Sequence, residues 1–348
     1  MSLISLFKRK NRKILFTTPS HNQNFFIFNK FRQLYKYDIS ETDAHAPETA
    51  LLKAEQSASK IYGTISTHFL TNGSTSGIIA AVLACTSPND KILIWDNAHM
   101  AHCNAVELAG CKPIFYSLNQ INNWDIPDKI DVCQFENLLK MYSPKATIIT
   151  SPSYEGIVCD IKSIAQICKK HNTFLIVDEA HGALYPFSDK LPTSAVKIAD
   201  YTIQSLHKTA GGLNPTALLH CNCKLSPTSA LKKISTTSPS YPLLATIEAN
   251  INYLKSAKCK NKIDDLIITI NDMKLDFKNI EFSGDDPLKI LIKHKNFNGV
   301  ELSEKLFNEF NIEDEKTNNT STMLLCGVGT TIKKINSLER ALNKLDKL

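Results

Sequence analysis

The sequence predicts an α/β protein with a mostly parallel central sheet flanked by helices and a small C-terminal α/β domain. Short apolar runs rich in β-branched residues alternate with helical patterns from about residue 51 to 219. After about residue 260 a second, shorter strand–helix–strand–helix pattern begins. Strands that alternate with helices form parallel sheets covered on both faces. We therefore expect an irregular N-terminal segment at 1–50, a large domain at 51–260 and a small domain at 261–348.

The elements of the large domain are recognised from their apolar patterns and their ends. Gly63 and Gly110 each follow a helical pattern, as glycine often does after a last helical turn, and Asp160 is placed to cap the start of another helix. The helical patterns lie at 50–63, 74–87, 99–110 and 160–172. The strand-like runs lie at 67–73, 91–96, 112–117, 146–151, 173–178, 201–206 and 216–220.

The small domain has two strand patterns, at 286–295 and 321–328, and two helical patterns, at 298–311 and 333–348. We expect it to cover a site built by the large domain, after a compressed link at about 250–276.

Composition and charge exclude several classes of partner. The 348 residues carry a formal charge of +6, and the lysines and acids are interspersed, so we predict no nucleic-acid partner. No window approaches the roughly 18 apolar residues of a membrane-spanning helix, and we predict no membrane partner. The basic run at 8–13 is interpreted as a solvated tail, with a weak membrane-surface contact as the alternative.

The ten cysteines are scattered, and several lie in apolar runs, which is typical of buried thiols in a reducing compartment such as the cytoplasm. Cys221 and Cys223 lie close together beside His220. A metal site there would need a second ligand pair at zinc-like spacing, and none follows, so we predict no metal.

Three hydroxyl residues stand at the start of the predicted helix 74–87. Ser74, Thr75 and Ser76 follow Asn72-Gly73, where a strand stops. The free N–H groups of a helix N-terminus, with hydroxyl donors beside them, make a phosphate site. An ordinary helix cap without a ligand is the alternative, and no G-x-G-x-x-G dinucleotide fingerprint is present.

Two further strands end on groups that suit a pyridine aldehyde cofactor. Asp178 ends a buried run, where a carboxylate can keep a pyridinium nitrogen protonated. Lys208 follows another apolar run, flanked by Ser205 and His207, and a lysine there can form a Schiff base with an aldehyde. Alone, Asp178 could be a cap or a magnesium ligand and Lys208 a surface lysine; their occurrence in this order favours the cofactor.

Five stretches together resemble the major domain of the Orn/Lys/Arg decarboxylases, a pyridoxal 5'-phosphate (PLP)-dependent family with the aspartate-aminotransferase type I fold. They are "LTNGSTSG", "WDNAHMAHCNAVELAGCKPIFY", the segment from "ATIITSPSYEG" to "FLIVDEAHGA", the segment from "LPTSAVKIADYTIQSLHKTAGG" to "LNPTALLH", and "STTSPSYPLLATIEAN". They lie in the family's order and cover roughly residues 40 to 250.

The resemblance implies a role for individual residues. Lys208 would carry the cofactor as a Schiff base, Asp178 would pair with the pyridine nitrogen, and His181 would lie next to the reacting carbon. His99 would stack on one face of the ring and Ala180 would pack on the other, although a histidine at a helix start can also make a local hydrogen bond. The residues that would hold the phosphate are Ser74, Thr75, Ser76, Ser205 and His207. Ser238 would approach the cofactor near the subunit boundary, or be a turn residue before Pro239.

The implied activity is the decarboxylation of an amino acid, with a basic one (ornithine, lysine or arginine) favoured. The implied setting is polyamine biosynthesis by a cytoplasmic homodimer or higher homo-oligomer. The alternatives are another PLP-dependent reaction, transamination or elimination, and a non-catalytic relative that acts as a partner subunit.

Three departures from the family bear on substrate choice. The family's Pro-Gly-His-Lys is Pro-Ser-His-Asn at residues 19–22, the small domain is short, and the family's further C-terminal region is missing. That region would supply an acidic residue for the side chain of a basic substrate. The candidates left for this role are Glu155, Asp43 and Glu41. We expect a different amino acid, another PLP reaction, or a partner chain that completes the pocket.

Overall fold

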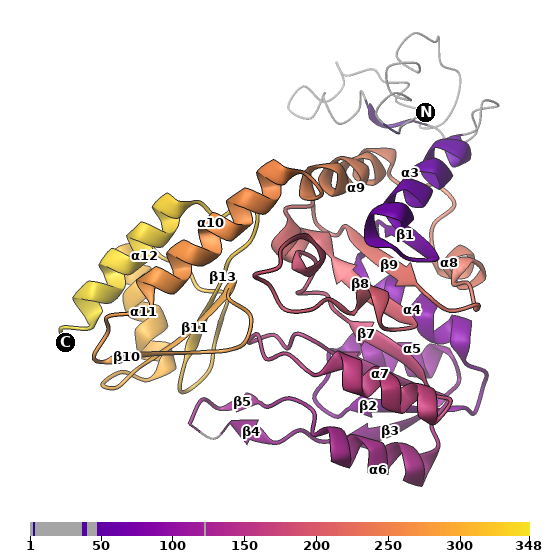
Figure 1. The fold of residues 1–348 in the computed structure, drawn as a ribbon, viewed down its shortest axis with the longest axis horizontal. Coiled ribbons are helices and arrows are strands. Elements are labelled where there is room, and N and C mark those ends of the chain that lie inside the picture. The colour runs from indigo at the N-terminus through magenta and orange to yellow at the C-terminus, as the bar shows by residue number, and fades with distance from the viewer. Residues whose placement is uncertain (1–2, 4–36, 40–46, 122) are drawn as a thin grey trace.

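The computed structural model describes residues 3, 37–39, 47–121 and 123–348. Their largest sheet has seven strands in the order β1-β9-β8-β7-β6-β2-β3 (Figure 1). The strands are β1 (Ser66–Leu70), β2 (Lys91–Trp95), β3 (Lys112–Tyr116), β6 (Ala146–Thr150), β7 (Phe174–Asp178), β8 (Tyr201–Ser205) and β9 (Ala217–Cys221). Only β9 runs antiparallel to its neighbours in this sheet. The mostly parallel sheet confirms the predicted fold class.

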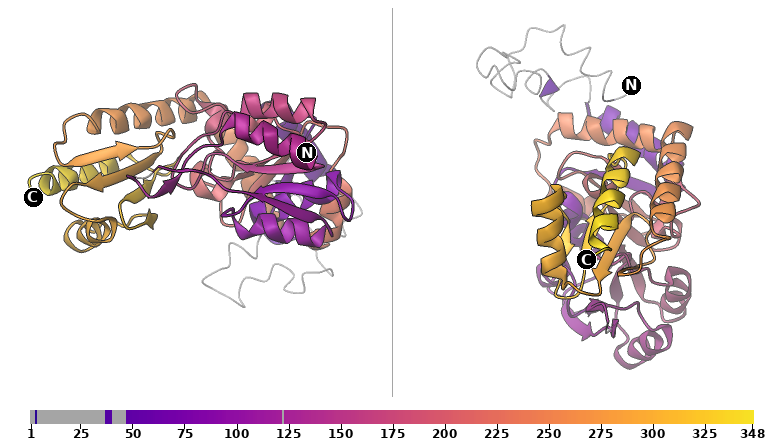
Figure 2. Two further views of the ribbon diagram at one scale, coloured as in Figure 1. Left: turned by 90° about the horizontal axis from the view of Figure 1, so that it is seen from below. Right: turned by 90° about the vertical axis from the view of Figure 1, so that its left-hand side faces the viewer.

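Helices cover both faces of this sheet (Figure 2). Ile92 and Ile94 of β2 pack in one core with α4 (Gly73–Cys85) and α5 (Met100–Leu108). Leu93, between them, packs in another core with α6 (Val132–Tyr142) and α7 (Ile161–Lys170). Side chains alternate across a strand, and apolar residues at successive positions are therefore what a sheet buried on both faces requires.

The second sheet has four antiparallel strands in the order β10-β11-β13-β12. They are β10 (Ile280–Ser283), β11 (Lys289–His294), β12 (Lys316–Thr317) and β13 (Thr322–Leu325). The helices α11 (Gly299–Phe310) and α12 (Ile332–Leu345) follow the expected order, and this smaller sheet lies beside the large one in Figure 1.

The compressed link expected near 250–276 is instead largely helical. Two helices, α9 (Tyr241–Leu254) and α10 (Ala257–Met273), occupy this part of the chain. The other two helices not yet described are α3 (Pro47–Tyr62), which precedes β1, and α8 (Thr228–Ile234), which follows β9. Buried residues of α9 and α10 share one apolar core with the smaller sheet and its helices. The proposed division at residue 260 falls within α10 and stays a prediction. The segment 1–50, apart from residues 3, 37–39 and 47–50, lies outside the described residues.

A short hairpin, β4 (Gln120–Ile121) and β5 (Ile126–Pro127), lies between β3 and α6 in the chain and packs against the smaller sheet. Trp124 at its turn and Ile126 pack with Leu291 and Met323 of the smaller sheet. Asn318 Nδ2 donates hydrogen bonds to the carbonyl oxygens of Trp124 and Asp125, at 3.1 and 2.9 Å.

None of the helices in the described ranges is long and apolar enough to cross a bilayer.

The smaller sheet also touches the turn that follows β8. Val328, just after β13, donates a backbone hydrogen bond to the carbonyl oxygen of Thr209 at 2.9 Å. A Cβ atom on the neighbouring Gly327 would lie 2.4 Å from that same oxygen, so only glycine permits this approach.

We predict that Gly327→Ala destabilises the protein by about 1–3 kcal/mol, because the new methyl group must push the chain away from Thr209. Chemical denaturation measures this change. Gly329→Ala is the matched control, since a Cβ there has nothing within 4 Å, and it should leave stability nearly unchanged. Equal effects of the two substitutions would contradict the prediction.

Candidate active site

A cavity of about 510 Å³ lies at the carboxyl ends of β2, β6 and β7, where ligands bind in open parallel sheets. Lys208 enters it from a wide helical turn, Leu206–Ala210, which directly follows β8. The smaller sheet contributes Lys316 and Asn318. The sequence-predicted residues that line the cavity are Ser74, His99, Asp178, Ala180, His181 and Lys208. Six predicted residues from four separate segments therefore meet at one place.

Asp178, the last residue of β7, is a buried carboxylate with two hydrogen-bond donors. His102 Nε2 on α5 donates to Asp178 Oδ2 at 2.9 Å, and the Ala180 backbone N–H donates to Oδ1 at 3.1 Å. Burial by itself raises the pKa of Asp178, but these bonds, the charge of His102 and that of Lys208 outweigh burial and lower the pKa below its ordinary value. Asp178 is therefore held ionised inside the protein.

Lys208 Nζ lies 3.0 Å from His181 Nε2 and donates to it. Burial is the main cause that lowers the pKa of Lys208, while Asp178 and Glu315 oppose it. Burial also lowers the pKa of His181 well below its ordinary value, and the nearby lysines Lys289 and Lys208 add to this effect. The imidazole is therefore neutral at ordinary pH and accepts the hydrogen bond from the ammonium group.

The start of α4 has the open geometry expected of a phosphate site. Its N-cap, Asn72, makes no side-chain hydrogen bond to the first turn, and the turn contains no acidic residue. Ser74 lines the cavity, and Thr75 follows it on the same turn. Ser76 points elsewhere, because its hydroxyl donates to the Gly73 carbonyl at 2.8 Å and it does not line the cavity.

The remaining predicted residues have different surroundings. Ser205 is fully buried, and its hydroxyl has no partner among the described residues. His207 Nδ1 donates to the carbonyl oxygen of Thr216 at 3.1 Å. Ser238 is exposed beside Thr236 and lies away from the cavity within one chain. His99 lines the cavity and also accepts a hydrogen bond from the Ala101 N–H at 3.2 Å, so it caps α5 locally.

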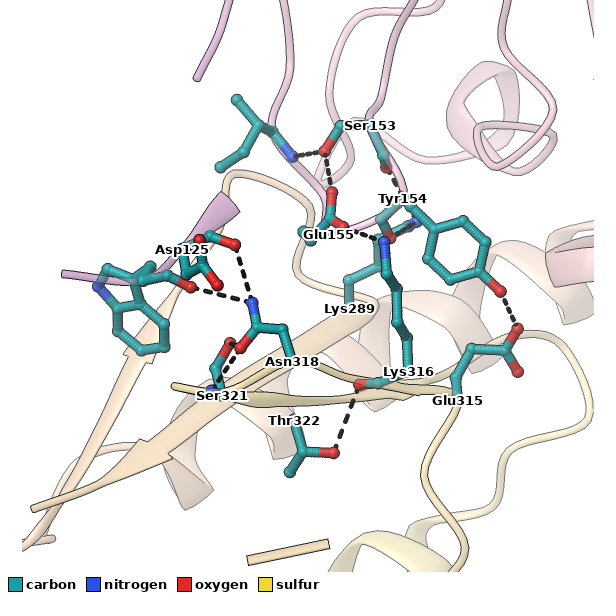
Figure 3. A network of polar contacts seen from close by, with 12 residues as sticks. Asp125, Ser153, Tyr154, Glu155, Lys289, Glu315, Lys316, Asn318, Ser321 and Thr322 are labelled. Carbon is teal, nitrogen blue, oxygen red and sulfur yellow. Dashed lines mark hydrogen bonds and ion pairs between the residues drawn. The ribbon is translucent and has the colours of Figure 1, made fainter. Parts of the chain in front are cut away.

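A polar network closes the side of the cavity that faces the smaller sheet (Figure 3). The loop after β6 carries Tyr154 and Glu155. Lys289, the first residue of β11, extends its side chain toward this loop. Lys289 Nζ donates to the carbonyl oxygen of Ser153 at 3.1 Å and to that of Tyr154. Burial lowers the pKa of Lys289 to about 7, against the opposing charges of Asp286 and Glu155. Lys316 Nζ donates to Glu155 Oε1 at 2.6 Å.

Several of these residues were not expected from the sequence. His102 stands three positions after His99, a spacing that puts both near one side of a helix start, and this is the only sequence signal for it. Lys289, Lys316 and Tyr154 gave no signal, because each acquires its neighbours through the packing of the two sheets.

The described residues contain no cluster of three or more histidine, cysteine or acidic side chains suited to a metal ion.

The fold is shared with solved structures of decarboxylases. The lysine decarboxylase of Francisella novicida superposes with a TM-score of 0.84 at 18% identity, and the match covers 99% of this chain and 60% of that one. The chain thus spans about 60% of the length of that enzyme. These likenesses show the fold, which this chain also shares with the alanine–glyoxylate aminotransferase of Nostoc sp. at a TM-score of 0.65 and 13% identity.

Sequence comparison gives the family. The model of the Orn/Lys/Arg decarboxylase major domain matches residues 8–285, and the chain belongs to this family. The uncharacterized protein YaaO of Bacillus subtilis is 27% identical over an alignment of 339 positions, which covers 90% of this chain and 71% of that protein. The arginine decarboxylase of Bacillus anthracis is 26% identical over an alignment of 367 positions, which covers 97% of this chain and 74% of the enzyme.

Family and fold imply pyridoxal 5'-phosphate as the cofactor, and the residues present fit it. The uncapped start of α4 offers N–H donors for a phosphate, and the buried hydroxyls of Ser205 and Thr150 lack partners among the described residues. Asp178 offers an ionised carboxylate for a ring nitrogen, and Lys208 offers an amine in the same cavity. These contacts to the cofactor stay predictions for the individual residues.

We predict that His102→Leu destabilises the protein by about 1.5–3 kcal/mol at pH 7, because it removes a charge-assisted hydrogen bond from a buried carboxylate. The lowered pKa of Asp178 contributes stability that is present above the unfolded pKa of about 3.9 and is lost as pH falls through the folded pKa. The difference between wild type and variant should therefore be full above about pH 5 and shrink toward pH 3.

Denaturant titrations across this pH range measure the difference. His171→Leu is the control, because His171 is paired with the surface residue Glu136 at 3.3 Å and should cost about 1 kcal/mol or less. A deficit of His102→Leu that stays constant down to pH 3 would rule out the role assigned to Asp178.

Proposed function

We propose that the protein is a PLP-dependent decarboxylase that acts on an amino acid, with a basic amino acid as the substrate. One observation carries the proposal: Asp178 and Lys208, the two groups that this chemistry requires, line a single cavity in a chain of the Orn/Lys/Arg decarboxylase family. The arginine and ornithine decarboxylases among its relatives support the same activity.

Different residues would bind the cofactor and control its protonation. When bound, pyridoxal phosphate supplies an electron sink for the electron pair left on the α-carbon as carbon dioxide departs. Asp178, kept ionised by His102, would hold a proton on the ring nitrogen and so maintain that sink. Ser74 and Thr75 would bind the phosphate group at the start of α4, and His99 and Ala180 would enclose the ring from two sides.

Lys208 is the better of the two candidate proton donors to the α-carbon. His181 is held neutral and accepts a hydrogen bond at Nε2, so it has no proton to give at that atom. Lys208 Nζ carries protons and its pKa is lowered by burial, which makes proton transfer easier than from an exposed lysine. His181 would then orient the amine of Lys208.

Glu155 supports a basic substrate. Its side chain is only 8% exposed and lines the same cavity as Lys208. A buried carboxylate is the group that recognition of an ammonium or guanidinium ion requires. Asp43 and Glu41, the other candidates, lie outside the described residues.

The alternatives have less support. Transamination between dicarboxylates uses an arginine clamp for the second carboxylate. The one arginine in the described ranges, Arg340, is exposed on α12 and donates a hydrogen bond to Ser337. A non-catalytic partner subunit would not need an ionised Asp178 and a half-buried Lys208 in the same cavity. We further propose a cytoplasmic homodimer or higher homo-oligomer, with Ser238 near a subunit boundary, and a cofactor-binding domain at 51–260.

We expect the cofactor-loaded protein to release carbon dioxide from ornithine, lysine or arginine, supplied separately. Lys208→Ala should abolish this release, and borohydride should no longer fix the cofactor to the chain, as intact mass would show. Lys169→Ala, an exposed lysine on α7, is the control and should retain both properties. Covalent cofactor without release from any amino acid would favour a different PLP reaction; no bound cofactor at all would favour a non-catalytic relative.

A further inference from the structure

The Glu155 carboxylate is already occupied by a cation of the same chain. Lys316 Nζ donates to Glu155 Oε1 at 2.6 Å, and Ser153 Oγ donates to Glu155 Oε2 at 3.1 Å (Figure 3). The Glu155 side chain is 8% exposed, so these contacts replace most of its hydration. The carboxylate, its hydroxyl donor and the ammonium group together form a small cation site inside the cavity.

An aromatic face completes this cation site. Lys316 Nζ lies 4.8 Å from the centroid of the Tyr154 ring, a distance typical of a cation–π contact. Tyr154 is held in place by a hydrogen bond from its hydroxyl to Glu315 Oε1 at 2.5 Å. A carboxylate beside an aromatic face is a combination that binds ammonium and guanidinium groups well.

Direct contacts connect the cation site to the reacting end of the cavity. The Tyr154 ring lies 4.7 Å from the His181 ring, and His181 Nε2 lies 3.0 Å from Lys208 Nζ. Glu155 and Lys208 line the same cavity, and His181 and Tyr154 lie between them, so a molecule held at Lys208 would reach Glu155 by extending past these two rings. An α-amino acid with a cationic side chain has this shape, with its charge at the far end.

Lys316 can leave the cation site, whereas the neighbouring Lys289 cannot. Lys316 belongs to the two-residue edge strand β12, and its side chain is 46% exposed. Lys289 is fully buried and donates to two backbone carbonyls of the loop after β6. A half-exposed lysine on an edge strand can change rotamer without disturbing the sheet. Movement of Lys289 would instead remove two hydrogen bonds from the loop after β6.

We propose that Lys316 is an internal competitor for the substrate: its ammonium group occupies the subsite for the distal cation and withdraws when a substrate ammonium or guanidinium group arrives. Glu155 Oε2 already accepts a hydrogen bond from Ser153, and an arriving cation repels the ammonium group at Oε1, so the half-exposed Lys316 gives way. The exchange keeps Glu155 paired throughout, and affinity falls by the fraction of time that Lys316 occupies the site. This inference rests on the proposed function, because it assigns the side-chain subsite of the same cavity.

Binding of two amines to the cofactor-loaded protein tests the inference without using turnover. Calorimetry would compare 1,5-diaminopentane, which has a distal cation, with n-pentylamine, which lacks it. Lys316→Met should tighten the diamine by about tenfold, the factor expected if Lys316 fills the site about 90% of the time, and leave the monoamine unchanged. Glu155→Gln should remove the preference for the diamine.

The control is Lys305→Met, because Lys305 makes the same two kinds of contact on the surface. It pairs with Glu309 at 3.3 Å and lies 4.8 Å from the Phe297 ring centroid, and its loss should change neither affinity. Lys316→Gln, a second variant that removes the charge, should repeat the effect of Lys316→Met and so exclude a folding artefact.

Unchanged or weaker diamine binding in both Lys316 variants would overturn the inference, as would failure of the diamine to bind any variant better than the monoamine. The weaker result would mean that Lys316 holds Glu155 in position for the distal cation instead of competing with it. The outcome is separate from that of the proposed function: the expected affinity changes without carbon dioxide release would retain the subsite and reject decarboxylation. Carbon dioxide release without the affinity changes would support decarboxylation and reject the subsite.

Discussion

On the proposed function, the chemistry of this protein depends on the hydrogen bond between His102 and Asp178. A carboxylate at the end of a central strand, covered on both faces, would take up a proton if nothing opposed its burial. His102 opposes it from α5, and the Ala180 N–H opposes it from the chain just beyond β7. The parallel sheet brings Asp178 to the edge where β2, β6 and β8 also end, and the other cavity residues gather there for the same reason.

The smaller sheet also contributes residues to the cavity and supports the loops around it. Lys289 supports the loop that carries Tyr154 and Glu155, Gly327 permits close contact with the turn that carries Lys208, and β12 supplies Lys316. On the proposed function, the large sheet provides the site for the cofactor, and the smaller sheet provides the wall at the far end of the cavity. The end with Asp178 and Lys208 would determine the reaction, and the end with Glu155 and Lys316 would determine which substrate side chain is accepted.

Much of this arrangement could be predicted from the sequence, and the missing parts share a physical cause. Asp178 and Lys208 could be found because each ends an apolar run, and parallel strands bring such ends together. Ser74 could be found from the residues at a helix start. His102 pairs with a residue 76 positions away, and Glu155 pairs with Lys316 across 161 positions; no local pattern encodes such pairs. The helices α9 and α10 were missed because a change in composition was interpreted as a short link.

The contact of Gly327 with Thr209 and the bonds of Lys289 to the loop after β6 together limit how this cavity can open. A rigid rotation of the smaller sheet away from the large one would break both at once, and such domain movements take microseconds to milliseconds. Rotation of a half-exposed side chain on an edge strand breaks neither and occurs in picoseconds to nanoseconds. On the inference made for Lys316, a small molecule enters the pocket when this one side chain rotates, and the contacts between the two sheets stay in place.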